Sequence, residues 1–206
     1  MDTAFPCVRP MPPITTTQRA IALTCLVLLM AATRLNHFAS IPDASWAVFF
    51  IGGFYLRAWT RWAFPLLMTL AVVVDWLVIH SLGLDFWQHY CMSPGYWMLL
   101  PAYFAMWAGG MRLGHGYQGA RWSTLGKAAL LLVASVAVCH LFAQGGFYWT
   151  TRNVAAPTVG GWLQNYADWF GPYLGTAALY VGLAVGLQVA REQVGKLRQV
   201  QRDIRR

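Results

Sequence analysis

The sequence has few charged side chains, and acidic ones are the scarcest. Charged residues make up 11% of the 206 positions, with 7 Asp and Glu against 15 Lys and Arg. Hydrophobic residues make up 58%, and the mean hydropathy is +0.46. This balance is typical of an integral membrane protein and excludes an ordinary soluble domain. The net charge of +8 is compatible with binding to nucleic acid, but the placement of the basic residues instead indicates an orientation in a membrane, as described below.

Cysteine is also scarce, and its distribution excludes a disulfide framework. The four cysteines are Cys7, Cys25, Cys91 and Cys139, and the apolar pattern puts them in a tail, a span, a loop and a span. We expect Cys25 and Cys139 to pack as small hydrophobic residues. Cys91 is then the one accessible thiol.

The sequence lacks a nucleotide-binding motif and a structural metal motif. Residues 119–127 resemble a P-loop, but the spacing is too long and Ala128 stands where Ser or Thr must meet magnesium. His89 and Cys91 form a His-x-Cys pair without the second pair that a structural zinc site needs. We therefore expect no nucleotide and no structural metal.

Long apolar runs are abundant instead. A membrane-spanning helix needs about 20 apolar residues, and six runs approach or reach this length: 19–35, 44–56, 62–82, 94–111, 125–144 and 169–190. They predict an all-α membrane protein with six transmembrane helices. The first run has the length of a signal-peptide core, but no small-residue cleavage site follows, so we expect it to remain as a span. We divide the chain into a flexible lead (1–18), a membrane domain (19–190) and a basic amphipathic cytoplasmic tail (191–206).

The basic residues predict the orientation. With six spans, the segments on one side hold 13 of the 15 Lys and Arg, and the other side holds only Arg34 and Arg152. Because cytoplasmic loops carry the excess of basic residues, both termini are predicted to be cytoplasmic. We therefore expect the basic residues to face the lipid bilayer, and we expect no nucleic acid as a partner.

Asp75 interrupts the third run. A carboxylate at that depth costs at least ~2.5 kcal/mol unless it is paired or hydrated. It therefore requires a partner or a cavity. It could line a binding pocket, or a hydroxyl or amide of a neighbouring helix could satisfy it.

Cys91 lies just before a helix start at Ser93 and Pro94. A thiol there faces the positive end of the helix dipole, which favours the thiolate, the form that binds metals. Several aromatic side chains surround it in the sequence and suit a flat, partly apolar ligand. The candidates for such a pocket are Tyr90, Tyr96, Trp97 and Tyr103.

Two glycine patterns suggest further features near the C-terminus. Residues 145–168 are bounded by glycine pairs and rich in Trp and Tyr, so we interpret them as a lid, with an interfacial aromatic belt as the alternative. Two Gly-x-x-x-Gly pairs in the last run predict close packing against a neighbouring helix within the chain. These are Gly171, Gly175, Gly182 and Gly186.

The segment Cys-Met-Ser-Pro-Gly-Tyr at 91–96, with Leu-Leu-Pro-Ala-Tyr at 99–103 and Asp75 before them, resembles the BtuM family of bacterial cobalamin transporters. The likeness is best over residues 35–107. It implies a six-helix bundle like the S-components of energy-coupling factor (ECF) transporters, in the bacterial inner membrane, with cobalamin held at the periplasmic face. It also implies that Cys91 is the axial cobalt ligand, with Asp75, Tyr96 and His37 as pocket residues.

One departure bears on the partners. S-components that dock on a shared ECF module commonly carry Ala-x-x-x-Ala in the first helix, but here Ala20 is followed by Thr24 and Ala22 by Leu26. The resemblance therefore favours a solitary transporter. A thiolate is a competent axial ligand for cobalt(III), and we hypothesise that it assists the loss of an upper ligand such as cyanide.

Three alternatives remain open at this level. The chain could be an S-component-like binding subunit for another vitamin or corrinoid precursor. It could be a membrane enzyme that handles thiols or haem with His89 and Cys91, or an accessory subunit of a larger complex.

Overall fold

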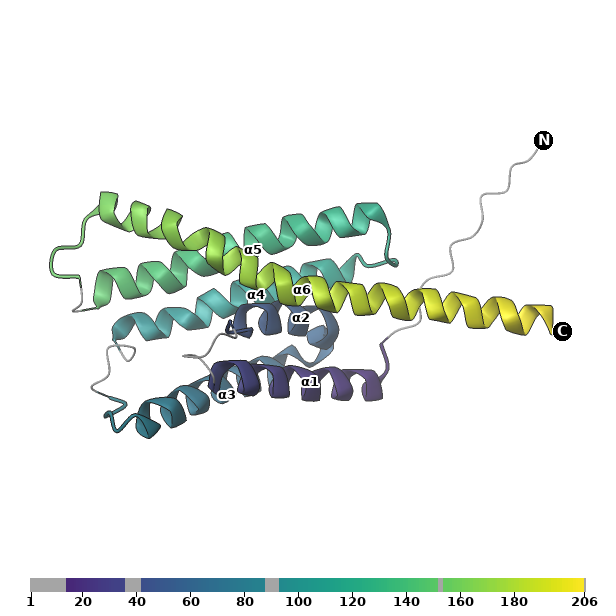
Figure 1. Cartoon of the computed structure of the whole chain (residues 1–206), viewed down its shortest axis with the longest axis horizontal. Helices are drawn as coiled ribbons and strands as arrows, with labels where there is room; N and C mark the ends of the chain where they lie inside the picture. The colour runs from purple at the N-terminus through teal and green to yellow at the C-terminus, as the bar shows by residue number, and fades with distance from the viewer. Residues whose placement is uncertain (1–13, 36–41, 88–92, 152–153, 206) are drawn as a thin grey trace.

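The computed structural model describes residues 14–35, 42–87, 93–151 and 154–205, and this part of the chain is helical without a strand (Figure 1). The elements are α1 (Thr16–Leu35), α2 (Ser45–Leu56), η1 (Arg57–Trp59), α3 (Thr60–Ser81), η3 (Pro94–Met98), α4 (Leu99–His115), α5 (Trp122–Thr150) and α6 (Val159–Ile204), where η marks a 3₁₀ helix. The all-α prediction is confirmed. Each of the six predicted apolar runs overlaps one of the α-helices.

Four helical stretches are long and apolar enough to cross a bilayer: Thr16–Leu35, Ser45–Ser81, Trp122–Thr150 and Val159–Ile204. The second of them joins α2, η1 and α3. These stretches support a membrane-embedded protein.

The short helix α2 forms the centre of the bundle and packs against α1, α3, α4 and α6 (Figure 1). Its side chains are buried on all sides, including Phe49 at 0% and Phe50 at 2% exposure. A helix that is hydrophobic all round is stable only when its neighbours cover it completely. The apolar composition of α2 therefore explains its central place.

Glycines let α2 and α4 approach backbone to backbone. A Cβ on Gly53 would collide with the carbonyl oxygen of Trp107, and a Cβ on Gly110 would collide with the carbonyl oxygen of Phe50. Backbone atoms cannot turn away as a flexible side chain can, so these positions admit only glycine without moving a helix.

Several predictions about packing are wrong. A Cβ on any of the four α6 glycines of the Gly-x-x-x-Gly pairs would meet open space, so Gly171, Gly175, Gly182 and Gly186 pack against no helix in the described part of the chain. Cys139 is buried as expected, but Cys25 is exposed on the outer face of α1. The physical reason is that α6 turns these glycines outward and packs with Ala177 and Val181.

The predicted lid at 145–168 is also wrong in its extent. Helix α5 continues to Thr150 and α6 begins at Val159, so both glycine pairs lie inside helices. Gly145 and Gly146 are covered by Trp162 and Met98, which favours packing over hinge motion. Only a short connection separates the two helices.

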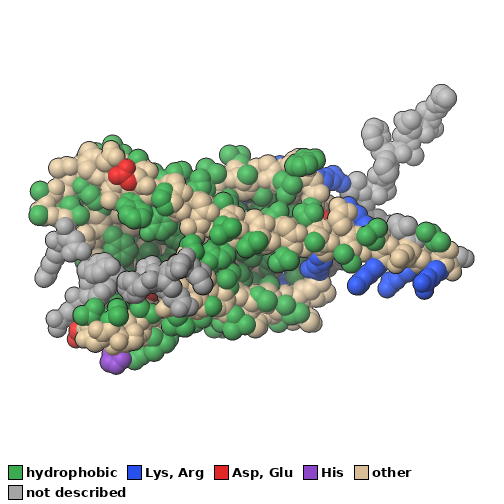
Figure 2. Space-filling model, viewed as in Figure 1, with side chains coloured by type: hydrophobic (Ala, Val, Ile, Leu, Met, Phe, Trp, Pro, Cys, Tyr) green, Lys and Arg blue, Asp and Glu red, His purple; other side chains and the backbone are tan. Residues whose placement is uncertain are grey.

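Basic side chains gather at one end of the bundle and along the projecting end of α6 (Figure 2). This end holds the start of α1, the α2–α3 and α4–α5 connections and the end of α6. Among the described Lys and Arg residues, Arg34 alone lies at the opposite end, as the second-last residue of α1. We call the two the basic end and the Arg34 end.

The close approach of α2 and α4 generates a first prediction. Gly110→Ala should lower the free energy of unfolding by about 1–3 kcal/mol, because the added methyl group overpacks a backbone contact. Gly126→Ala in α5 is the matched control, since its Cβ would meet nothing within 4 Å. Thermal unfolding of the purified proteins checks this, and equal stability of the two variants would contradict the described helix contact.

A buried arginine cluster as the candidate functional site

Arg34 lies at the centre of a polar cluster inside the Arg34 end of the bundle. Its side chain is only 9% exposed, although Arg is strongly hydrated in water. The cluster, called the Arg34 cluster below, consists of Arg34, Asp43, Ser45, Asp75, Tyr96 and Tyr103. Its members come from α1, the segment before α2, α2, α3, η3 and α4.

The strongest contact joins Arg34 to Asp75 across α1 and α3. Arg34 Nε donates to Asp75 Oδ1 at 2.6 Å and Nη2 donates to Oδ2 at 2.7 Å. This two-pronged geometry matches the planar guanidinium to the carboxylate and is stronger than a single charged hydrogen bond. It also provides the partner that the depth of Asp75 requires.

The remaining nitrogen of Arg34 ties in α2 and α4. Nη1 donates to Ser45 Oγ at 2.8 Å, to Asp43 Oδ2 at 3.2 Å and to Tyr103 Oη at 3.3 Å. Asp43 Oδ1 in turn accepts from the backbone N–H of Ser45 at 3.0 Å and from its hydroxyl at 2.7 Å. The Asp43 carboxylate thus lies at the start of α2, where the helix dipole favours a negative charge.

Tyr96 completes the cluster from η3. Its hydroxyl donates to Asp75 Oδ2 at 2.8 Å. Ser93 and Pro94 begin η3, and the N–H of Gly95 donates to Thr150 Oγ1 at 2.8 Å. A Cβ on Gly95 would lie 2.5 Å from the carbonyl oxygen of Gly146. The end of α5 therefore fixes η3, and with it Tyr96, against α3.

The cluster packs against an aromatic pair on one side and has partly exposed carboxyl groups on the other. The ring of Phe49 stacks on that of Tyr103 at 4.5 Å with an interplanar angle of 13°. The side chains of Asp43 and Asp75 are 22% and 21% exposed, against 9% for Arg34. Two carboxyl groups thus meet one guanidinium group. The exposed side of the cluster is thus acidic and offers hydrogen-bond acceptors.

The structure brings together three of the predicted site residues: Asp75, Tyr96 and Tyr103. Trp97 is 67% exposed and, within the described residues, has no bond to the cluster. Cys91, His37 and Tyr90 lie outside the described residues, as does His89. The part that the structure describes contains no group of three His, Cys, Asp or Glu side chains that could hold a metal ion.

Sequence reasoning missed Arg34, Asp43 and Ser45 as site residues. Two signals pointed to Arg34: it is one of two basic residues on its predicted side, and Asp75 needs a partner. No local pattern joins the two, because 41 residues separate them.

No protein-family model matches the chain, and no curated protein matches it.

A second prediction concerns the ion pair. Arg34→Ala should lower the free energy of unfolding by about 3–5 kcal/mol, because it leaves both Asp43 and Asp75 without their cation. Asp75→Ala should lower it by less, because Arg34 keeps its ion pair with Asp43. Arg34→Met with Asp75→Leu should cost less than the sum of the two losses, since it removes the pair whole and leaves only Asp43 without its cation. Unfolding in a detergent titration measures all three.

Arg61→Ala, at the exposed start of α3, controls for the loss of an arginine and should change stability by less than about 0.5 kcal/mol. Additive losses in the double variant would contradict a direct pair.

Proposed function

We propose that the chain is a six-span transporter of the bacterial inner membrane that takes up cobalamin from the periplasm, with Cys91 as the axial cobalt ligand. One observation supports this above the others. Asp75 and Tyr96, which come from separate segments of the resemblance to the BtuM family, share a 2.8 Å hydrogen bond. Two positions far apart in sequence thus form one local polar site, as a common ligand would require.

The proposal extends to Cys91 through the connectivity of the chain. Cys91 precedes Ser93 by two residues, and two residues cover at most about 7 Å. Ser93 in turn begins η3, which carries Tyr96. The thiol and the Arg34 cluster are therefore near enough in the chain to serve one large, flat ligand.

The proposed orientation follows from the charge distribution. The basic end corresponds to the cytoplasmic side under the positive-inside rule, so the Arg34 end is periplasmic. Helix α4 has only 17 residues, but together with η3 it runs from residue 94 to 115. That length suffices for one further span of about 20 residues. Six spans result when α2 and α3, which form one of the four stretches above, are counted separately. Both termini would then be cytoplasmic.

The Arg34 cluster supplies the polar side of the proposed site. The partly exposed carboxylates of Asp43 and Asp75 can accept hydrogen bonds from the amide groups around the corrin ring. Arg34 holds both carboxylates in place, and Tyr103, stacked on Phe49, accepts a further hydrogen bond from Arg34. His37, Tyr90 and Trp97 remain candidates for further contacts to the ligand.

The proposed chemistry at cobalt is a ligand exchange. The Cys91 thiolate donates an electron pair to cobalt(III), and an upper ligand such as cyanide leaves with its own pair, so the metal keeps its oxidation state. A soft, strongly donating sulfur suits this role. No ECF module is part of the proposal, because the first helix lacks the Ala-x-x-x-Ala pattern.

Uptake in living cells tests the transport proposal. In a cobalamin-dependent strain without its own transporter, the wild-type chain should restore growth on cobalamin and Cys91→Ser should not. Cys25→Ser is the matched control, because Cys25 is exposed on α1 away from the proposed site, and it should rescue growth. Failure of the wild type would refute transport, whereas rescue by Cys91→Ser would remove the sulfur from the mechanism.

An absorption spectrum tests cobalt ligation separately. Purified wild type loaded with cyanocobalamin should differ in its visible bands from the free vitamin, because sulfur replaces an axial ligand. Cys91→Ala should lose this difference, while Tyr96→Phe should keep the bands and bind more weakly, since it loses only the bond to Asp75. Identical spectra of wild type and Cys91→Ala would rule out ligation. Copurification of a colourless vitamin would favour the S-component-like alternative.

A further inference from the structure

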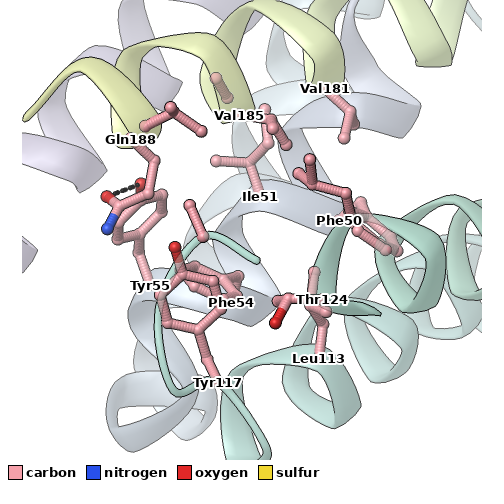
Figure 3. A pocket seen from close by; sticks show the side chains of 15 residues that line it. Phe50, Ile51, Phe54, Tyr55, Leu113, Tyr117, Thr124, Val181, Val185 and Gln188 are labelled. Atoms are coloured by element: carbon pink, nitrogen blue, oxygen red, sulfur yellow. Dashed lines mark hydrogen bonds between the residues drawn. The ribbon is translucent and has the colours of Figure 1, made fainter. Parts of the chain in front are cut away.

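A concave feature lies at the basic end, apart from the Arg34 cluster. It is a groove between α2, the α4–α5 connection, α5 and α6 (Figure 3). Its walls are apolar and include Phe50 and Phe54 of α2, Leu125 and Ala128 of α5, and Val181 and Val185 of α6. The groove is shallow: its cavity volume is about 50 Å³, well below that of sites that enclose a small molecule, so a ligand would lie along it.

One end of the groove is polar. Tyr55 donates to Gln188 at 2.9 Å, and Gln188 donates to Glu192 at 2.8 Å (Figure 3 shows the first bond). Tyr117 and the N–H of Ala120 also donate to Glu192. Burial and the adjacent Glu192 raise the pKa of Tyr117, so its phenol stays protonated and donates. The bonds hold the α4–α5 connection against α6 and close this end.

Cations surround the polar end. Arg121 directly follows Ala120 at the start of α5 and is exposed. Arg191 directly precedes Glu192, which accepts from the N–H of Ala120 at 2.9 Å, so Arg121 and Arg191 each adjoin one partner of this contact. The groove therefore has apolar walls along most of its length and two cationic residues near its polar end. It differs in this from the Arg34 cluster, whose carboxylates suit the amide groups of the proposed cargo.

We propose that this groove binds one acyl chain of an anionic phospholipid, with the phosphate held by Arg121 and Arg191. The apolar walls exclude water and polar ligands. The two flanking helices also carry exposed apolar side chains outside the groove, such as Leu130 at 70% and Leu187 at 74%, as expected of helices that face lipid. Arginine forks fit phosphate oxygens, and basic residues at the inner surface attract anionic lipids. The inference needs only a membrane-embedded chain and holds whether or not cobalamin is the cargo.

Two kinds of variant test the binding of the acyl chain and the binding of the phosphate headgroup separately. Ala184→Trp places a large ring in the groove that Ala184 lines, and Ala178→Trp places the same ring on the exposed face of α6. Arg121→Gln with Arg191→Gln removes the cations at the mouth. The control for charge is Arg198→Gln with Arg202→Gln, on the projecting part of α6.

The measurement is the immobilised fraction of spin-labelled lipid on the full-length protein in nanodiscs, with phosphatidylglycerol and phosphatidylcholine as the two probes. Wild type should prefer phosphatidylglycerol, and each lost arginine should weaken that preference about fivefold. Ala184→Trp should abolish immobilisation of both probes. Both controls should match wild type. A salt concentration of 1 M should remove the preference for phosphatidylglycerol but leave the acyl chain bound.

Three outcomes would overturn the proposal: equal retention of the two lipids by wild type, identical behaviour of Ala184→Trp and Ala178→Trp, or an unchanged preference after both arginines are lost. A change in oligomeric state caused by Ala184→Trp alone would assign the groove to a second copy of the chain instead. If Ala184→Trp does not fold, the arginine variants decide the matter, since both side chains lie at the surface.

Discussion

The bond between Arg34 and Asp75 is the constraint on which the Arg34 end of the molecule depends. A charge placed among apolar helices is costly unless a partner and further hydrogen bonds satisfy it. Here each charge satisfies the other, and the spare donors and acceptors reach α2, η3 and α4. Two charged hydrogen bonds, 2.6 and 2.7 Å long, therefore join α1 to α3. The same bonds orient the carboxylates that face the proposed ligand.

Helix α2 connects the two sites. It begins at Ser45 in the Arg34 cluster, and its Phe50 and Phe54 line the groove at the basic end. Between these points it lies against α4 with no side chain at Gly53 and Gly110 to separate the backbones. Interiors packed this closely transmit displacement rather than absorb it. A shift of α2 would therefore alter the Arg34 cluster and the groove at the basic end together.

The sequence predicted those features that depend on local pattern. Apolar runs identify the helices because backbone hydrogen bonds must be satisfied in an apolar medium, and the depth of Asp75 predicts a partner. The identity of that partner depends on how α1 and α3 pack across 41 residues, which no local pattern encodes. Glycines misled the prediction twice. Gly145 and Gly146 pack inside α5 and do not hinge a lid, and the Gly-x-x-x-Gly pairs of α6 face outward, because glycine spacing does not reveal which face a helix buries.

The length of α6 has a mechanical consequence. Its 46 residues make a continuous helix of about 70 Å, more than twice the hydrocarbon thickness. Among the described residues, Glu192 is the last side chain of α6 that is hydrogen-bonded to another element. The residues after it project from the bundle (Figure 1). From residue 191 to 204 the helix forms a lever of about 20 Å. A tilt of roughly 10° at its base would move its tip by about 4 Å, so the C-terminus amplifies small rotations of the bundle into displacements that a probe attached there would register.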